Sequence, residues 1–372
     1  MLRRLGAVHA HLTPLPSAAT VDVGPAEIAP PVDPDVELIY KKFDIPSRRL
    51  QAEWRAQWIA ERVNGILPQL MDESGVEFWV VSQKEYGEDT CWRALTPATQ
   101  QAARRRSVIV FRRTPEGVEQ RIFIGFWKET WEDVRAFLCS GGGGDIAVNR
   151  SKTSAFADGM AAGEFDAFEE GVGAECMARV KYPELLPTHF LMLRAPSMLP
   201  HYRDACELSH AVMCESMSNN VITPGQTTCA DVSWWMWQRS IDLGFECWFQ
   251  PSFGVQRPGV SGTLDGDTVI ERGDMLWTDY GIDYAGMMTD QQHMGYVCNL
   301  GESAPPQGLV DGLKQTNGMQ DTILEEMQVG RTGNEVLAAF DARMRAEGIN
   351  GTMYPGIPAL RHSSLSALSE HE

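Results

Sequence analysis

Apolar residues recur at helical spacing along several stretches of the chain. Over residues 49–67 they share one face of a predicted helix, and Pro68 suits a terminating turn. Further helices are predicted by the same spacing, an acidic one beginning at Phe165 and four others at 201–219, 228–243, 308–327 and 334–347. Gly330 and Gly348 follow the last two and are typical C-terminal stops.

Short β-rich runs occupy the intervals between these helices. In the first half they lie at 78–81, 107–111, 121–126 and 146–149, and a Thr114-Pro-Glu-Gly turn separates the second run from the third. In the second half, runs at 275–280, 283–288 and 294–299 are joined by short turns at Gly281 and Gly286. This second group predicts an antiparallel meander.

Together these patterns predict an α/β amino-terminal domain followed by an α+β domain in which helices flank an antiparallel sheet. Two prolines between residues 191 and 200 mark the boundary, so we expect the domains at 46–190 and 191–354. Residues 1–45 are expected to form a disordered tail or a targeting segment, and residues 355–372 have the composition of an atypical tail.

The charge and the cysteines narrow the class of protein. The 372 residues include 50 acidic and 32 basic side chains, a formal net charge of -18, which excludes an unassisted nucleic-acid or anionic-membrane surface. No apolar run approaches the roughly 20 residues of a membrane helix. The eight cysteines form no C-x-x-C pair, which favours reduced thiols and a cytoplasmic location. The alternative location is an organelle, because the first 21 residues carry Arg3 and Arg4 but no acid.

Two aspartates carry the strongest chemical signal. Asp279 and Asp290 stand 11 residues apart, each near the edge of a predicted strand, so a hairpin would bring them together. Two carboxylates within about 4 Å repel by roughly 4 kcal/mol at an effective dielectric constant of 20, so protons or cations must neutralise them. Divalent manganese, cobalt or zinc suits such oxygen ligands. The alternative is that both, like Asp283, are turn acids that face solvent.

The residues around this pair resemble a known signature. Gly273-Asp-Met-Leu-Trp-Thr-Asp279-Tyr-Gly281, followed by Thr289-Asp290, is similar to the paired-Asp signature of the creatinase/Xaa-Pro peptidase family. Other stretches that resemble segments flanking the site in relatives known as Xaa-Pro dipeptidases lie at 149–151, 158–159, 221–225, 227–228 and 331–334. The resemblance spans residues 45 to 354.

This resemblance implies a creatinase/prolidase-like amino-terminal domain and a pita-bread domain with two divalent metal ions. Two Asp, one His and two Glu ligate the ions in the family, and only the Asp pair maps here, onto Asp279 and Asp290 as metal ligands. The implied reaction is hydrolysis of the bond between an N-terminal residue and proline by metal-activated water. The implied partners are a small peptide with proline in second position and a second copy in a homodimer. No residue is assigned as catalytic, and no further cofactor is expected.

The match breaks off before the remaining ligands. A His-Pro-x-Gly segment should follow Tyr354, which instead runs into Pro355-Gly-Ile-Pro, and both Glu ligands should lie farther downstream. The residues of ligand type in that stretch fit neither motif and are interpreted as tail residues: His362, Glu370, His371 and Glu372. A frame change or truncation after Tyr354 would explain this, and we expect the chain as printed to be impaired. The alternative function is a non-catalytic pita-bread homologue that acts as a binding or dimerisation module.

A histidine and a group of tryptophans receive a structural interpretation. His293 lies three residues beyond Asp290, and strand alternation places it on the opposite face. Trp234, Trp235 and Trp237 are candidates to line a pocket for an apolar or prolyl side chain. The spacing of Trp234 and Trp237 favours instead neighbours in a helical core.

Three further stretches are also interpreted without a ligand. Three arginines at 104–106 predict a solvated surface turn, since the chain is strongly acidic. The glycines at 141–144 lack the Lys-Ser/Thr of a phosphate loop. Residues 248–257 lack the substrate-facing His that many members of the family carry.

Overall fold

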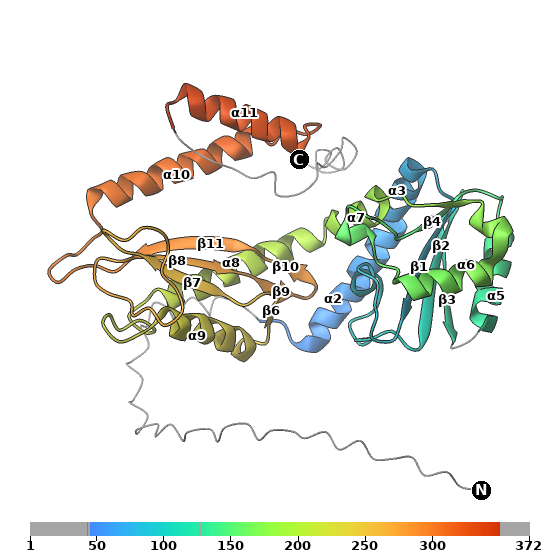
Figure 1. The fold of residues 1–372 in the computed structure, drawn as a ribbon, viewed down its shortest axis with the longest axis horizontal. Coiled ribbons are helices and arrows are strands. Elements are labelled where there is room, and N and C mark those ends of the chain that lie inside the picture. The colour runs from blue at the N-terminus through green and yellow to red at the C-terminus, as the bar shows by residue number, and fades with distance from the viewer. Residues whose placement is uncertain (1–42, 44, 126–127, 350–372) are drawn as a thin grey trace, which may run out of the picture.

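The fold is that of a computed structural model, described over residues 43, 45–125 and 128–349. A five-stranded sheet and its helices lie at one end, and the strands β6 to β11 lie at the other (Figure 1). Helix α2 (Arg48–Glu61) runs between the two. Within these ranges, no helix combines the length and the apolar character that crossing a membrane requires.

The first helix is longer than its apolar pattern indicates. α2 continues through a π-helical turn, Arg62–Ile66, into α3 (Leu67–Ser74). Pro68 falls in the first turn of α3, directly after the π-helical turn, and the helix continues past it. The helix ends instead at Gly75, whose φ of 65° is left-handed. The predicted end at Pro68 is therefore wrong.

The amino-terminal sheet has the strand order β3-β2-β1-β4-β5. Its strands are Phe78–Lys84 (β1), Arg106–Thr114 (β2), Gly117–Gly125 (β3), Ile146–Val148 (β4) and Val180–Lys181 (β5). β2 is antiparallel to both of its neighbours, and β4 is parallel to both of its neighbours. The predicted strands and the hairpin at Thr114 are confirmed.

Helices cover both faces of this sheet because alternate strand residues point to opposite sides. Trp79 and Val81 share a buried cluster with α3 and α7 (Leu185–Met192). Phe78 and Val80 share another with α5 (Lys128–Cys139) and α6 (Ala162–Met177). Two short helical segments, α4 (Trp92–Leu95) and η2 (Ala155–Ala157), lie in the connecting loops. The first half is thus the expected α/β unit.

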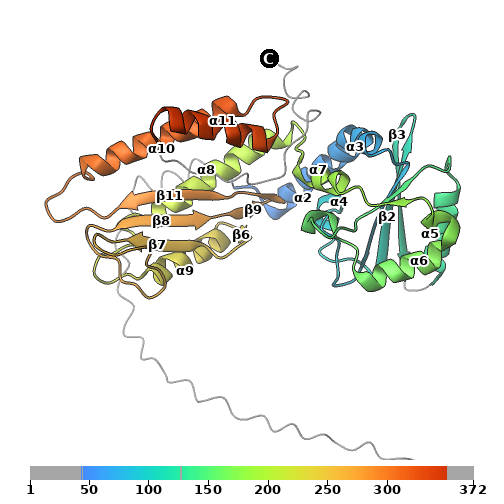
Figure 2. The ribbon, with the colours of Figure 1, turned by 45° about the horizontal axis from the view of Figure 1, so that its top comes forward.

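Two small antiparallel sheets form the second half, with α8 (Met198–Ser216) and α9 (Cys229–Asp242) packed against them. One has the order β11-β8-β7, with strands Gln291–Tyr296, Met275–Tyr280 and Ser252–Gln256 (Figure 2). The other has the order β10-β9-β6, with strands Met287–Met288, Ile282–Tyr284 and Glu246–Cys247. Helices that flank antiparallel strands make this half α+β, as predicted.

The strands β8 to β11 form one bent hairpin and not the predicted meander. β8 and β9 are separated by Gly281 alone, and β10 and β11 return along them as the second arm. At the bend, a Cβ added to Gly281 would lie 2.2 Å from the Thr289 carbonyl oxygen and 2.3 Å from Trp248 Nε1. Glycine fits this close approach because it has no side chain. The meander is wrong because the apolar pattern does not encode which strands pair.

The last described elements are α10 (Gln307–Glu326) and α11 (Gly333–Ala346), which pack against each other (Figure 1). Both helices are confirmed. Gly348 directly follows the C-cap of α11 with a left-handed φ of 71°, so this stop is confirmed. α10 already ends at Glu326, with Met327 as its C-cap, so the predicted stop at Gly330 is wrong. Apart from Phe43 and Ile45, the predicted tails at 1–45 and 355–372 lie outside the described residues. The domain boundaries stay predictions.

Candidate metal centre

Asp279 and Asp290 come together on the bent hairpin. Asp279 belongs to β8 and lies opposite Gln292 of β11, and Asp290 immediately precedes β11. The β9–β10 turn reverses the chain at Ala285 and Gly286, whose φ values of 55° and 91° are both left-handed. The hairpin therefore brings the two carboxyl groups close enough for the charge of Asp290 to act on Asp279, as the spacing predicts.

The electrostatics of this pair are unfavourable without a cation. Burial raises the pKa of Asp279, and the charge of Asp290 raises it further. Within the described ranges, no lysine, arginine or histidine forms a salt bridge with either aspartate. Oδ1 of Asp279 is buried and has no hydrogen-bond partner. A buried, unpaired carboxylate oxygen beside a second carboxylate fits a bound cation.

A short chain of hydrogen bonds orients the other oxygen of Asp279. Gln292 Nε2 donates to Asp279 Oδ2 at 3.2 Å, and Trp277 Nε1 donates to Gln292 Oε1 at 3.3 Å. The three side chains share one face of the sheet, because Trp277 alternates with Asp279 along β8. Neither Gln292 nor Trp277 was predicted, although each stands two positions from an aspartate, the strand spacing that would have indicated them.

Buried hydrogen bonds hold the segment that carries Asp290. The Thr289 hydroxyl accepts a bond from Ile282 N–H at 3.0 Å and lies 2.7 Å from the hydroxyl of Ser209 on α8. The Trp248 indole donates to the Thr289 carbonyl oxygen at 2.6 Å. Thr289 is therefore tied to a helix and to the neighbouring strand. These contacts fix the backbone directly before Asp290.

Two carboxylates are the ligand groups that this centre offers. In residues 43, 45–125 and 128–349, no group of three or more His, Cys, Asp or Glu side chains could hold a metal ion. The residues of ligand type after Tyr354 lie outside these ranges: His362, Glu370, His371 and Glu372. The residues present thus fit a cation at the carboxylate pair. The role of Asp279 and Asp290 as ligands stays a prediction.

The other residues that the sequence singled out lie elsewhere. His293 pairs with the buried Thr278, on the face of β11 opposite Gln292, and its ring contacts His210 of α8. It does not contact the aspartate pair, in agreement with strand alternation.

The tryptophan and arginine predictions need correction. Trp234 and Trp237 stack with their ring centroids 5.5 Å apart, but Trp234 is 61% exposed, so their place in a core is wrong. Of the three tryptophans of α9, Trp235 packs against the core, because it lies beside the buried face that carries Val232 and Met236. Arg106 lies in β2 and donates from Nε to the buried Glu164 at 2.7 Å, so the solvated turn is limited to residues 104–105.

The glycine run holds a carboxylate of the chain itself. Gly142 N–H and Gly144 N–H donate to the two oxygens of Glu77 at 2.7 and 2.8 Å. Burial acts to raise the pKa of Glu77, but these bonds and the guanidinium of Arg112 outweigh it, and the pKa is lowered. The amides of this loop are therefore engaged by Glu77.

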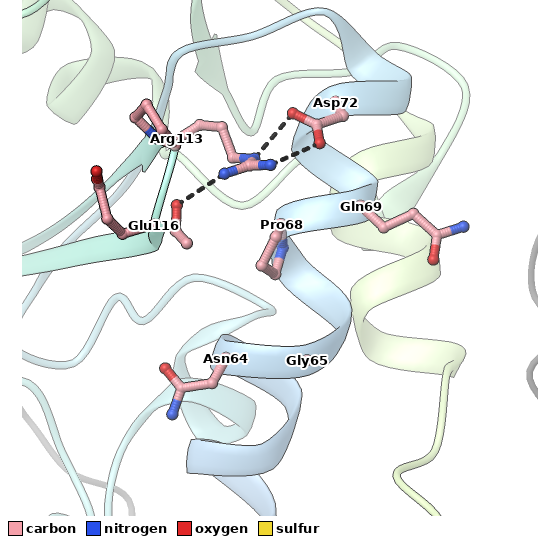
Figure 3. Close-up of a pocket in the computed structure, with 9 residues that line it drawn as sticks. Asn64, Gly65, Pro68, Gln69, Asp72, Arg113 and Glu116 are labelled. Atoms are coloured by element: carbon pink, nitrogen blue, oxygen red, sulfur yellow. Dashed lines mark hydrogen bonds and ion pairs between the residues drawn. The ribbon is translucent and has the colours of Figure 1, made fainter.

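A surface pocket of about 440 Å³ lies in the amino-terminal half, between the π-turn with α3 and the β2–β3 hairpin (Figure 3). Arg113 and Asp72 face each other across it, and Arg113 donates from Nε and from Nη2 to the two oxygens of Asp72 at 2.9 Å each. Arg113 Nη1 also donates to the carbonyl oxygen of Gly117 at 3.1 Å. Its guanidinium is thus neutralised within the chain, and we assign this pocket no ligand.

Comparisons with known proteins agree with this description. The sequence model of Metallopeptidase family M24 matches residues 200–363, a range that includes both aspartates and extends beyond Tyr354. No curated protein sequence matches the chain.

Several solved structures share the fold. An Xaa-Pro dipeptidase from Bacillus anthracis has a TM-score of 0.53 and 16% identity, over 78% of this chain and 78% of that chain. An X-Pro aminopeptidase from Thermotoga maritima has a TM-score of 0.55 and 12% identity, over 75% of this chain and 78% of that one. A prolidase from Pyrococcus horikoshii has a TM-score of 0.52 and 14% identity, over 77% of this chain and 78% of that one.

Proposed function

We propose that the protein is a metal-dependent hydrolase of Xaa-Pro peptides. Residues 200–363 match the model of Metallopeptidase family M24, and the chain shares the fold of solved Xaa-Pro peptidases. The predicted fold class, an α/β creatinase-like domain with an α+β pita-bread domain, is confirmed by the same comparisons. The proposed substrate is a small peptide with proline in second position. A homodimer and a cytoplasmic location complete the proposal, the latter supported by eight free thiols.

The observation that carries the proposal is the carboxylate pair. Asp279 and Asp290 are close enough to raise the pKa of Asp279, and Asp279 Oδ1 is buried without a partner. A cation would neutralise the repulsion and satisfy that oxygen at once. Hard oxygen ligands of this kind suit manganese, cobalt or zinc. The proposed centre, with two ions as the resemblance implies, therefore uses both aspartates.

The chain's own residues would hold the metal ion and orient its carboxylate ligands. A divalent ion bound at the pair would polarise the scissile carbonyl group and lower the pKa of the attacking water. Gln292 keeps Oδ2 of Asp279 occupied by an N–H donor, so that Oδ1 is the oxygen left for the ion. Thr289 holds the backbone next to Asp290. Both carboxylates would thus be placed before the ion arrives, which lowers the cost of assembling the centre.

The test is the release of free proline from Xaa-Pro dipeptides in the presence of manganese, cobalt or zinc, with a chelator as the blank. We expect slow, metal-dependent release, because the described residues supply two of the five ligands that the resemblance implies. Asp279→Asn and Asp290→Asn should abolish it, since each removes an anionic ligand at nearly constant volume.

The matched control is Asp283→Asn on the same hairpin. Asp283 Oδ1 accepts the Gly286 N–H at 2.6 Å, and an asparagine oxygen accepts the same bond, so this variant should behave like the unaltered chain. Release that continues in the chelator would rule out a metal-dependent reaction. Metal bound without any release would favour the non-catalytic binding module.

A further inference from the structure

Three side chains outside the candidate centre meet where α8 lies along β11. His210 Nδ1 and His293 Nε2 are 2.6 Å apart, and Cys214 Sγ lies 3.5 Å from His210 Nε2, one helical turn along α8. His210 and Cys214 are exposed and His293 is half-buried. β11 is the outermost strand of its sheet, so the group lies at a rim of the domain.

One backbone acceptor determines which nitrogens of this group carry protons. His293 Nδ1 lies 2.7 Å from the carbonyl oxygen of Gln292, which accepts and cannot donate, so Nδ1 carries the proton. In the neutral ring, His293 Nε2 then holds a lone pair, which accepts from His210 Nδ1–H. His210 Nε2 accepts in turn from the Cys214 thiol. The lone pair of His293 Nε2 therefore faces His210.

We propose that His210 and His293 form a second metal-binding site, for an ion that prefers imidazole nitrogen, such as Ni²⁺, Zn²⁺ or Cu²⁺. A ligating histidine commonly donates its other ring N–H to a backbone carbonyl, which fixes the tautomer and the ring orientation. His293 already has this arrangement through Gln292. The two donors come from α8 and β11, so the ion would join the helix to the edge strand.

The geometry needs only a small adjustment. Two nitrogen ligands at 2.0–2.1 Å from an ion lie about 2.9 Å apart at the right angle of a square-planar ion and about 3.3 Å apart at a tetrahedral angle. The two nitrogens are now 2.6 Å apart, so they must separate by about 0.3 to 0.7 Å. His210 is exposed, so its ring has room to move by this distance while Gln292 holds His293. The proton of His210 moves from Nδ1 to Nε2, so the imidazole stays neutral and no net proton is released.

Two further observations define the site. Burial, and then the neighbouring His293, lower the pKa of His210, which keeps its lone pair available at neutral pH. Cys214 touches the far nitrogen of His210, so it lies outside the pair of donors, and water would fill the remaining positions. This agrees with the finding that no group of three or more His, Cys, Asp or Glu side chains in the described ranges could hold a metal ion.

The proposed site is separate from the carboxylate pair. His293 lies opposite Thr278 in the register, whereas Asp279 lies opposite Gln292, so the two sites occupy opposite faces of β11 and β8. Their chemistry also differs, because carboxylates suit Mn²⁺ and imidazoles suit Ni²⁺. The inference does not depend on the proposed hydrolase.

The test is a calorimetric Ni²⁺ titration of the full chain and of single variants with glutamine at each histidine. His210→Gln and His293→Gln should each weaken Ni²⁺ binding about tenfold or more, because each removes half of the protein donors. His9 and His11 are also close in sequence. The double replacement of His9 and His11 by glutamine is therefore the matched control, and it should leave the affinity of this site unchanged. Asp279→Asn should likewise leave it unchanged.

Copper gives a second, spectroscopic readout of the two donors. The electron paramagnetic resonance spectrum of one bound Cu²⁺ per chain should show coupling to two imidazole nitrogens, and His293→Gln should reduce this to one. Loss of Ni²⁺ binding in Cys214→Ser with retention in His293→Gln would overturn the proposal in favour of a site within α8. Unchanged Ni²⁺ binding in both histidine variants would also overturn it.

Discussion

Gln292 Nε2 donates to Asp279 Oδ2 across the β8–β11 pair at 3.2 Å, while Oδ1 of the same carboxylate stays buried without a partner. One oxygen is thus held by the protein and the other is left for a ligand. Gln292 is held in turn by the Trp277 indole. The direction in which Asp279 presents its free oxygen therefore depends on a side chain that is not itself a ligand.

Replacing Gln292 should weaken metal binding without removing a ligand. Gln292→Leu leaves Asp279 Oδ2 without its donor, and loss of such an orienting partner lowers metal affinity by roughly 10- to 100-fold. Calorimetric titration with Mn²⁺ measures this. Gln256→Leu is the matched control, because Gln256 is exposed on the neighbouring strand and lies opposite Met275 and not Asp279. Equal affinities for both variants would mean that Gln292 does not orient Asp279.

Replacing Thr289 should lower the free energy of unfolding. Thr289→Val removes the hydroxyl that serves the Ile282 N–H and the buried Ser209 hydroxyl, and unsatisfied buried groups cost about 1–3 kcal/mol. Urea unfolding should show a lower free energy of unfolding by that amount. The double variant with Ser209→Ala should lose less than the sum of the two single variants, because both remove the same bond. Strict additivity would show that the two hydroxyls are not coupled.

Asp89 should give stability a distinct pH dependence. Burial raises the pKa of Asp89 to about 6, against the bonds that it accepts from Cys91 and Asn149, whereas the unfolded value is about 3.9. The folded state therefore binds more protons than the unfolded state between about pH 4 and 6, so stability falls as pH rises through this window. The loss of stability across this window is about 3 kcal/mol, because each unit of difference between the folded and unfolded pKa corresponds to 1.36 kcal/mol.

The measurement is urea unfolding from pH 4 to 7 for the unaltered chain and for Asp89→Asn. The asparagine does not titrate, so the difference in free energy of unfolding should shift in favour of the variant as pH rises. Asp133→Asn serves as an exposed control, which should run parallel to the unaltered chain. A parallel course for Asp89→Asn as well would show that Asp89 has no raised pKa.

Gly281→Ala should distort the bend on which the centre is built. The added Cβ would meet the Thr289 carbonyl oxygen at 2.2 Å, and backbone atoms cannot move aside cheaply. Thermal unfolding should show a lower midpoint, and Mn²⁺ affinity should fall because Thr289 directly precedes Asp290. Gly308→Ala, at a helical position with nothing within 4 Å, is the control and should be neutral or stabilising. A variant Gly281→Ala with unchanged stability would contradict the described bend.

The sequence indicated the parts of the fold that local pattern encodes. Helical spacing located α8, α9, α10 and α11, and α8, α9 and α11 each bury one stripe of side chains, whereas Thr322 is the buried residue of α10. The spacing of Asp279 and Asp290, with a glycine turn between them, correctly predicted that a hairpin joins them. The bend in this hairpin was not predicted. It depends on the close approach of Gly281 to Thr289 and Trp248, and a local periodicity does not reveal such contacts.

The same distinction applies to single side chains. Trp234, Trp235 and Trp237 stand so close together on α9 that helical spacing alone does not say which one faces the core. The contact between Ser209 and Thr289 spans 80 positions and depends on how α8 packs on the sheet. The strand period places Gln292 on the same face as Asp290. Its role becomes evident only when its partner across the strand pair, Asp279 in β8, is known.

The central claim is that Asp279 and Asp290 together bind a divalent metal ion. The most direct measurement is calorimetric titration with Mn²⁺ of the unaltered chain, Asp279→Asn, Asp290→Asn and the control Asp283→Asn. The account predicts Mn²⁺ binding, however weak, by the unaltered chain and by Asp283→Asn, and its loss in each of the other two. Binding that survives in Asp279→Asn and Asp290→Asn, or that is lost in Asp283→Asn alone, would contradict it.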